Sequence, residues 1–279
     1  DVHLAAVLDE GGGIVTGLLS GVAEPVALLG NAEKGHVSVR LTVDSTGGHS
    51  SMPPNQTAIG ILSAALTQVE ATPFPAQVKM IRPMFEYLGP ACPTGIRLAF
   101  ANLWLLSGVV KRQLLASPKT AAAIRTTSAA TMITGGVKDN ILPRQAVAVV
   151  NSRILPGETV ASVVQRIRKV VNDPRVDVRL ASEDAAWDPS PVSGPDNPRF
   201  HWVETTIRQV FPDALVVPFL VLGATDARYY ARLSDSVFRF CPMYLDAEDM
   251  NRPHGVNERL SIDNCARMVR FFIQLIKTA

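Results

Sequence analysis

The sequence has few cysteines and few aromatic residues, and it has no long hydrophobic run. The three cysteines show no paired spacing such as C-x-x-C, which argues against a zinc ribbon and against a disulfide framework. No stretch approaches the roughly 20 consecutive apolar residues that a membrane-spanning helix needs. These absences leave the cellular compartment open.

The chain also lacks a block of charge of one sign. Its 279 residues carry a net charge of +2, and no basic block or Arg-rich helix points to nucleic acid. With 47% hydrophobic and 19% charged residues, the composition is that of a globular protein with one large domain or two small ones.

Several catalytic signatures are missing as well. A dinucleotide fingerprint that starts at Gly11 needs a glycine where Thr16 stands. No H-E-x-x-H motif, no Walker A loop and no correctly spaced nucleophile elbow occurs. The sequence has no internal repeat.

The first part of the chain predicts a strand that ends at acidic residues. Residues 3–8 are apolar and stop at Asp9 and Glu10, which three glycines follow. An open α/β sheet binds its ligands at such carboxyl ends of strands. Residues 37–43 then alternate apolar and polar side chains, which predicts a strand with one wet face. A Gly- and Pro-rich loop and a helix over 55–70 follow.

The middle of the chain predicts a second domain. Residues 73–135 are apolar and interrupted by prolines, with helices expected at about 97–106 and 120–133. Strands are expected at 139–143 and 146–154, a helix at 160–172 and a strand at 176–180. The order β-α-insert-β-β-α-β over about 35–190 is consistent with a ferredoxin-like sandwich that carries an extra apolar element.

The last part returns to the first domain. The Pro- and Gly-rich stretch 191–199 marks the crossing. A helix, a nearly all-apolar strand at 214–222, a second strand at 236–241 and a closing helix at 262–277 follow. A buried strand between helices implies a parallel or mixed sheet covered on both faces. We therefore predict domain segments at 1–34, 35–193 and 194–279, the middle one an insertion.

Four short polar stretches follow apolar runs, and each has an ordinary structural alternative. A histidine beside glycine can be a loop residue, and an acidic pair after a strand can form a turn or an N-cap. Asp226 can cap the helix that follows it. The stretches are Asp9-Glu10-Gly11-Gly12, Gly48-His49-Ser50-Ser51, Gly223-Ala224-Thr225-Asp226 and His254-Gly255-Val256-Asn257-Glu258.

Taken together, these stretches resemble the di-zinc metallopeptidase family of aminoacylase, carboxypeptidase G, carboxypeptidase S and the N-fatty-acyl-amino-acid hydrolases. Of these proteins, carboxypeptidase S and the N-fatty-acyl-amino-acid hydrolases are the most similar to this sequence. The resemblance runs from Val7 to Ser261. Its landmarks are LDEGG, EKG, GGHSSMPP, IRTTSA, GVKDNILP, VNSRILPGETV, GATDARYY and HGVNERLS.

The resemblance implies roles for five residues. Glu10 matches the acidic ligand of one zinc, and His254 matches the ligand of the other. His49 matches a lid-domain histidine that reaches a neighbouring active site and stabilises the oxyanion, and Asn140 matches the asparagine that assists it. Arg153 matches the arginine that holds the free carboxylate of the substrate.

Alternatives remain open at several of these positions. Asp9 is the second candidate for the acidic ligand, and a surface ion pair is the alternative for Arg153, for which we favour the substrate role. Asp226 and Arg228 are typical of this branch but receive no chemical role. The apolar insert 73–135 can hold an acyl group or side chain, or it can serve lid packing or a dimer surface.

The family pattern requires residues that this chain does not contain. An upstream His-x-Asp, a bridging Asp and a Glu-Glu pair are expected, and none is found here. A complete site holds two zinc ions, and a two-metal cluster needs a bridging carboxylate and further donors. We therefore expect this chain, as the C-terminal part of such an enzyme, to hold the cluster weakly and to be inactive alone.

The resemblance implies an α/β fold: a partial catalytic sheet domain of a zinc peptidase, with an inserted ferredoxin-like α+β lid or dimerisation domain. The implied function is zinc-dependent hydrolysis of an amide or peptide bond next to a free carboxylate. The alternative is a non-catalytic dimerisation or binding module. Expected partners are a dipeptide or N-acyl amino acid and a second copy of the chain, but neither nucleic acid nor a membrane.

Overall fold

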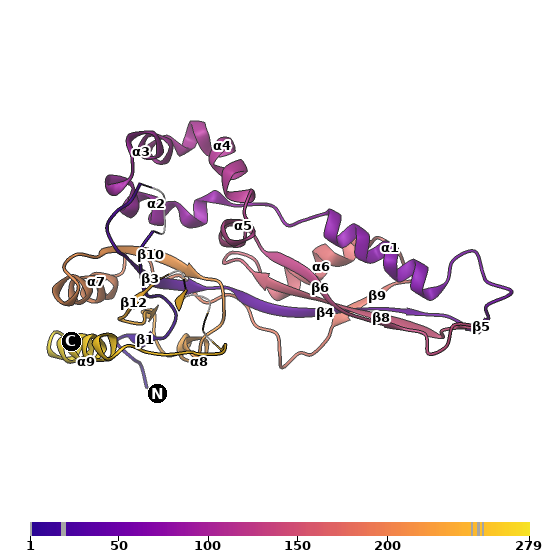
Figure 1. Cartoon of the computed structure of the whole chain (residues 1–279). Helices are drawn as coiled ribbons and strands as arrows, with labels where there is room; N and C mark the ends of the chain where they lie inside the picture. The colour runs from indigo at the N-terminus through magenta and orange to yellow at the C-terminus, as the bar shows by residue number, and fades with distance from the viewer. Residues whose placement is uncertain (1, 18–20, 247, 250–251, 253) are drawn as a thin grey trace. The chain divides into compact units, whose positions relative to one another are not determined.

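The computed structural model of the protein contains two compact units (Figure 1). It describes residues 2–17, 21–246, 248–249, 252 and 254–279. Unit 1 combines three stretches of chain, and unit 2 combines two. Unit 1 comprises Asp1–Glu33, Gln77–Ile124 and Ser190–Ala279, and unit 2 comprises Lys34–Ala76 and Arg125–Pro189.

Unit 2 is a four-stranded antiparallel sheet with two helices on one face (Figure 1). The chain order is β4-α1-β6-β8-α6-β9, and the sheet order is β6-β8-β4-β9. This topology confirms the ferredoxin-like prediction. The elements are β4 (Gly35–Asp44), α1 (Ala58–Ala71), β6 (Thr127–Gly135), β8 (Gln145–Ile154), α6 (Val160–Val171) and β9 (Asp177–Leu180).

The alternating side chains of β4 explain how this sheet meets its helices. Val37, Val39, Leu41 and Val43 are fully buried in a core that includes residues of α1 and α6. Side chains at the positions between them lie on the helix-free face. Thr57 caps α1 by accepting from Gly60 N at 3.1 Å, and a Thr159–Ser162 capping box starts α6.

A short two-stranded ribbon forms one end of unit 2. In it, β5 (Gly48–His49) pairs antiparallel with β7 (Ile141–Leu142). The ribbon follows the end of β4 and precedes the start of β8, where Asp44 pairs with Gln145. We call this end the tip of unit 2; Figure 1 shows β5 there.

Unit 1 is built on a mixed sheet. β3 pairs parallel with β10 and antiparallel with β2 and β11, while β1 is parallel to β11 and β12 is parallel to β2. The strands are β1 (Val7–Asp9), β2 (Ile14–Val15), β3 (Val26–Glu33), β10 (Leu215–Val221), β11 (Val237–Arg239) and β12 (Tyr244–Leu245).

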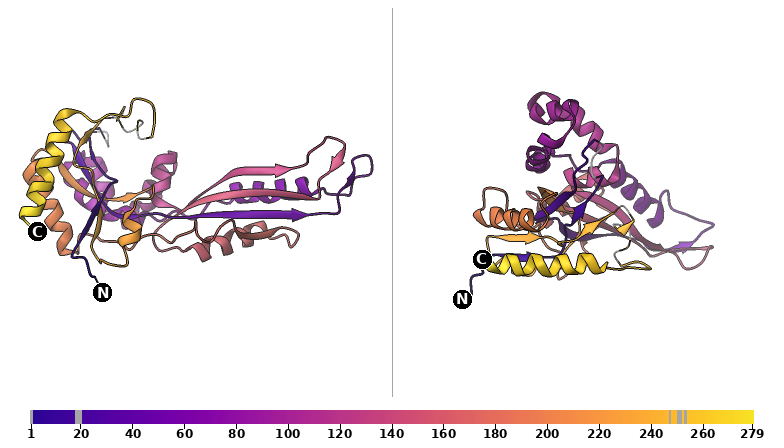
Figure 2. Two further views of the ribbon diagram at one scale, coloured as in Figure 1. Left: turned by 90° about the horizontal axis from the view of Figure 1, so that it is seen from below. Right: turned by 60° about the vertical axis from the view of Figure 1, so that its left-hand side comes forward.

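Helices cover both faces of this sheet, as the buried strand at 214–222 predicted. Ala27 and Leu29 of β3 face α7 (Pro198–Val210) and α9 (Ile262–Lys277), whereas Val26 and Leu28 share a core with Leu88 on the opposite face. Figure 2 shows the magenta helices and the yellow α9 on opposite sides of the strands. The short α8 (Ala227–Tyr230) contacts β1 and β11.

Residues 77–124, which we call the helical segment, belong to unit 1. The sequence placed them in the inserted domain 35–193, together with 190–193. They lie in unit 1 because α2 packs on β10 and covers one face of its sheet. The segment contains η1 (Val78–Ile81), α2 (Arg82–Leu88), η2 (Gly89–Ala91), α3 (Thr94–Ala101), α4 (Leu103–Leu115) and α5 (Pro118–Ile124).

Two local predictions were wrong, and one strand was missed. The helix expected at 120–133 ends at Ile124, and residues 127–135 form β6, because three threonines and Ile133 favour a strand there and β8 offers a partner. The helix expected at 97–106 breaks at Asn102 into α3 and α4. The buried strand β3 was not predicted. No helix among the described residues is long and apolar enough to cross a bilayer.

Candidate active-site residues

The acidic pair after β1 divides into one structural and one exposed carboxylate. Asp9 accepts hydrogen bonds from Glu10 N at 2.9 Å and from Ala227 N, the first residue of α8. Glu10 follows the end of β1 and its side chain is exposed. Because both oxygens of Asp9 are engaged by backbone groups, Glu10 is the better placed of the two to meet a ligand.

This arrangement corrects the capping role considered for Asp226. Asp226 occupies the N-cap position of α8, but its side chain makes no capping hydrogen bond. The cap comes instead from Asp9, more than 200 residues earlier in the chain. Arg228 donates to the Tyr229 hydroxyl at 2.6 Å and lies over its ring.

The glycines after Glu10 bring this loop close to the sheet. A Cβ on Gly12 would lie 1.7 Å from the carbonyl oxygen of Leu28, and one on Gly11 would lie 2.8 Å from Cβ of Arg239. Gly11 also has φ +144°, which side chains rarely adopt. The DEGG pattern is therefore required by packing as well as by any ligand.

A buried ion pair lies beneath the same loop. Arg239 Nε donates to Glu33 Oε2 at 3.3 Å, and the side chains are 0% and 1% exposed. Thr225 donates to the same oxygen from its backbone N at 3.1 Å and from its hydroxyl at 2.7 Å. Burial lowers the pKa of Arg239, while Glu33 and Asp9 oppose that shift. This network links β3, β11 and the turn before α8.

His254, the other candidate metal ligand, is exposed in a turn of unit 1. Its backbone N donates to Glu258 Oε2 at 3.1 Å, and its φ of +62° is left-handed. No group of three or more His, Cys, Asp or Glu able to hold a metal occurs among the described residues. Glu10 and His254 are suitable donors chemically, but these residues alone do not complete a zinc site.

The structure brings His49 and Asn140 together at the tip of unit 2. Ser50 N donates to the carbonyl oxygen of Asn140 at 3.1 Å, and His49 pairs with Ile141 across the ribbon. Both side chains are exposed. The predicted pair therefore occupies one end of one unit, although 91 positions separate them in the sequence.

The hydrogen bonds of His49 determine its tautomer. Ser51 N donates to Nδ1 at 3.1 Å, so Nδ1 is an acceptor and the neutral ring carries its proton on Nε2. The Ser51 hydroxyl lies 2.8 Å from the same Nδ1. Nε2–H is then the available ring donor, which is what an oxyanion requires.

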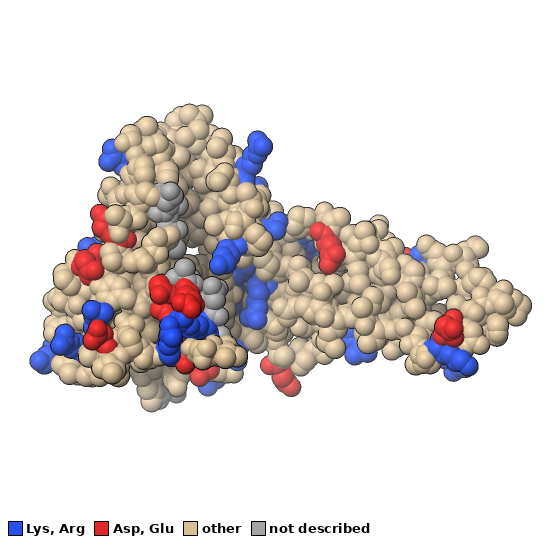
Figure 3. Space-filling model, in the orientation of Figure 1, with Lys and Arg blue, Asp and Glu red and all other residues tan. Residues whose placement is uncertain are grey.

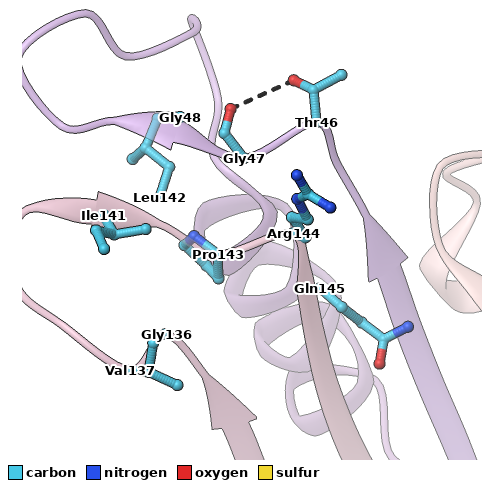
Figure 4. Close-up of a pocket in the computed structure, with 10 residues that line it drawn as sticks. All are labelled: Thr46, Gly47, Gly48, Gly136, Val137, Ile141, Leu142, Pro143, Arg144 and Gln145. Carbon is cyan, nitrogen blue, oxygen red and sulfur yellow. Dashed lines mark hydrogen bonds between the residues drawn. The ribbon is translucent and has the colours of Figure 1, made fainter.

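A hollow of about 610 Å³ lies beside this ribbon (Figure 4). Gly47, with φ +69°, allows the close approach of Arg144, because a Cβ there would lie 2.9 Å from Arg144 Cγ. The hollow is lined by Thr46, Gly47, Gly48, Gly136, Val137, Ile141, Leu142, Pro143, Arg144 and Gln145.

Arg153 lies near the other end of β8. It pairs with His36 of β4 and Thr127 of β6, and its side chain is half-buried on the helix-free face. Among the described residues Arg153 makes no side-chain hydrogen bond and no ion pair. The surface ion pair considered as its alternative is therefore absent from this part of the chain.

Other cations lie around Arg153. Lys34 is 1% exposed, and its Nζ donates to the carbonyl oxygen of Arg125 at 2.8 Å. Burial lowers the pKa of Lys34 to about 8; Glu158 opposes the shift, and Arg153 and Arg125 add to it. Glu158 accepts a hydrogen bond from Thr126. Sequence reasoning missed this cluster, although Lys34 is in the EKG landmark and Arg125 in IRTTSA.

The tip and Arg153 are far apart within one chain. Position 145, at the tip end of β8, and Arg153 are eight positions apart, and a strand rises about 3.3 Å per residue. His49 is thus on the order of 25 Å or more from Arg153. One small substrate cannot contact both side chains of the same chain.

Comparison with known proteins identifies the family. The profile of the peptidase dimerisation domain of the M20 family matches residues 31–178, more than half of the chain. The chain belongs to the M20 peptidase family. This confirms the resemblance seen in the sequence.

Two relatives match almost the whole of this M20 chain. It is 40% identical over 281 residues to N-fatty-acyl-amino acid synthase/hydrolase PM20D1 of Xenopus tropicalis, covering 100% of this chain and 54% of that protein. It is 38% identical to the probable carboxypeptidase S-like 2 of Dictyostelium discoideum, covering 97% and 52%. The chain thus spans about half the length of the curated relatives it matches.

Solved M20-type structures share the fold. The dipeptidase Dug1p of Saccharomyces cerevisiae matches with a TM-score of 0.58 and 15% identity, over 99% of this chain and 59% of that one. The metallo-carboxypeptidase Sso-CP2 of Sulfolobus solfataricus matches with a TM-score of 0.58 and 14% identity, over 98% and 63%. At such low identities the likeness supports the fold alone.

Proposed function

We propose that the protein to which this chain belongs hydrolyses an amide or peptide bond next to a free carboxylate, in an N-acyl amino acid or a dipeptide. The observation that carries the proposal is Arg153, a half-buried guanidinium without an acidic partner among the described residues. A planar guanidinium binds a carboxylate through two parallel hydrogen bonds. The names of the relatives, a hydrolase of N-fatty-acyl amino acids and a probable carboxypeptidase, support this substrate class.

His49 and Asn140 are proposed to stabilise the oxyanion that forms at the scissile carbonyl. The Nε2–H of the exposed His49 side chain is the available donor because Nδ1 accepts from Ser51 N, and Asn140 is adjacent across the ribbon. One such donor commonly contributes about 2.7–4 kcal/mol to the transition state. Neither group needs to change its protonation state for this role.

We further propose that the chain forms a homodimer through unit 2. Its edge strand β6 is uncharged and largely exposed, with Met132 62% and Ile133 58% exposed. An exposed apolar edge of this kind favours pairing with another strand. Because the tip is far from Arg153 in one chain, the tip of one copy would act at the site of the other.

Glu10 and His254 are proposed as one donor each for a pair of zinc ions. The described residues do not complete that site, so we assign no reaction step to the metal. Elemental analysis of the dialysed 279-residue chain should find well under one zinc per chain. Two tightly held ions would mean that the donor set proposed here is wrong.

The proposed function is tested in a longer protein that contains this chain and an upstream segment. Its hydrolysis of an N-acyl amino acid is compared with that of the matching C-terminal amide. Arg153→Ala should raise KM for the acid by about 10- to 100-fold and leave the amide nearly unaffected. Equal effects on both substrates would refute the carboxylate role.

The non-catalytic dimerisation or binding module remains the second candidate. It is favoured by the match of 31–178 to a dimerisation domain rather than to a catalytic one. A longer protein that dimerises but hydrolyses no N-acyl amino acid or dipeptide would support it. Hydrolysis that depends on Arg153 would exclude it.

A further inference from the structure

The outward side of α4 carries large apolar side chains. Trp104, Leu105 and Val109 are 81%, 66% and 68% exposed, and Leu98 of the neighbouring α3 is 56% exposed. Residues 104, 105, 108 and 109 lie on one side of a helix because 104 and 108, 105 and 108, and 105 and 109 are three or four positions apart. We call Leu98, Trp104, Leu105 and Val109 the α3–α4 patch.

The patch is not the side by which α4 packs within unit 1. The inner side carries Leu103, Leu106, Val110 and Leu114, of which Val110 is buried, and α4 contacts α5 and η1. A helix on a protein surface normally presents a polar outward side. In its first two turns α4 is apolar on both sides, so the outward side is suited to a second apolar environment.

The charges around the patch are almost all positive. The helical segment contains six basic residues and one acidic residue, Glu86, so its net charge is 6 − 1 = +5, against +2 for the whole chain. No Asp or Glu occurs between Glu86 and Asp139. On the face shown in Figure 3, the coloured side chains over α3 and α4 are basic. Exposed Arg112 and half-buried Lys111 continue α4 beyond the patch.

We propose that the α3–α4 patch docks on an anionic phospholipid surface. Trp104, Leu105 and Val109 enter the interface between headgroups and acyl chains, while Lys111 and Arg112 contact the phosphates. This division of apolar and basic side chains is typical of helices that lie in a membrane surface. The proposal revises the expectation of no membrane partner, which rested on the lack of a spanning segment.

A second apolar stripe provides a matched control. Ile262 and Ile276 of α9 are 87% and 74% exposed. The same helix carries Asp263 against Arg267, Arg270 and Lys277, so its net charge is 3 − 1 = +2, lower than the +5 of the helical segment. If charge selects the patch, α9 variants leave lipid binding unchanged.

The test is co-sedimentation of the 279-residue chain with vesicles. Binding is expected to an equimolar mixture of phosphatidylcholine and phosphatidylglycerol, but not to phosphatidylcholine alone, and it should weaken as salt is added. Leu105→Glu should lower the partition coefficient at least about tenfold. Ile276→Glu, the control, should not change it.

Tryptophan emission locates the contact. Binding should shift the emission to shorter wavelength as Trp104 leaves water. Trp104→Phe should still bind but lose the shift, because Trp187 and Trp202 lie elsewhere in the chain. Circular dichroism of each variant checks that the helices persist.

Three results would overturn the proposal. The first is that the chain does not bind the mixed vesicles at low salt. The second is that Leu105→Glu and Ile276→Glu lose binding equally. The third is that a longer protein containing this chain fails to bind because another segment covers the patch. None involves substrate, so each is distinct from failure of the proposed hydrolysis.

Discussion

Glu33 and Arg239 show how a charged pair is retained inside unit 1. Their side chains are 1% and 0% exposed, and Glu33 Oε2 accepts from Arg239 and twice from Thr225. Removal of one partner of a buried pair leaves a charge without compensation. The pair joins β3 to β11 directly below the loop that carries Glu10.

Arg239→Met is therefore expected to destabilise the chain by about 3–5 kcal/mol, because Glu33 remains buried and unpaired. The exposed pair Arg82–Glu86 is the control, with side chains 67% and 56% exposed. Arg82→Met should cost less than about 1 kcal/mol. Urea unfolding followed by circular dichroism measures both, and equal losses would contradict the argument.

Lys34 predicts a dependence of stability on pH. Its pKa falls to about 8 in the folded chain from 10.5. Between these values the unfolded chain binds more protons than the folded chain, so the free energy of unfolding should rise with pH. Below pH 8 both states are protonated and this contribution is constant.

The measurement is unfolding of the wild type and Lys34→Met from neutral pH to pH 10.5. The wild type should gain up to about 3 kcal/mol relative to the variant across the window. Lys79→Met, at an exposed position, should follow the wild type. A difference between wild type and Lys34→Met that does not change with pH would refute the prediction.

At the scale of elements, β6 is both a strand that was predicted as a helix and the proposed dimer edge. Its alanines and threonines lie next to the helix α5, and alanine favours helices. Pairing with β8 over eight positions decides the outcome. Such a tertiary partner, far along the chain, is invisible to a local pattern.

Other elements could be predicted because their signal is local. The alternation in β4 and the spacing in α6 reflect burial of one side, and the polar stretches at 9–12 and 223–226 fall at the ends of β1 and β10. The adjacency of His49 and Asn140 came from the resemblance alone. Lys34 and Arg239 escaped notice because nothing in a sequence pattern marks a buried cation.

Ile133→Lys tests β6 as the dimer edge. A charge on an edge strand opposes pairing with another strand. The variant should sediment as a monomer at concentrations where the wild type is a dimer, with at least about a tenfold weaker dimer. Val137→Lys, 97% exposed and just beyond β6, should remain dimeric. A monomeric wild-type chain would refute the homodimer.

At the scale of the whole molecule, the distance between the tip and Arg153 makes a prediction about pairs of chains. His49→Ala, in a longer active protein, should lower kcat about 100- to 1000-fold with zinc content unchanged. Arg153→Ala should be impaired as well. If His49 acts in trans, a mixed dimer of the two variants has one intact site.

Co-expression of the two variants should therefore restore about a quarter of wild-type activity, since half of the dimers are mixed and each has one good site. Co-expression of His49→Ala with Asn140→Ala is the control and should restore little, because both changes affect the same tip. No recovery in the first mixture would show that His49 and Arg153 act within one chain.

The points where the chain passes between its two units are closed by hydrogen bonds. Glu33 N donates to Ser190 Oγ at 2.9 Å and Ser190 N to Glu33 O at 3.1 Å, while Gln77 N donates to Ile124 O at 2.6 Å. The chain therefore contains one insertion inside another. The ends of the helical segment are hydrogen-bonded to each other, and this segment lies within the larger insertion 34–189, whose flanking residues are also hydrogen-bonded to each other. Either insertion can be exchanged for another segment, in evolution or by protein engineering, because the two ends to be joined already lie side by side.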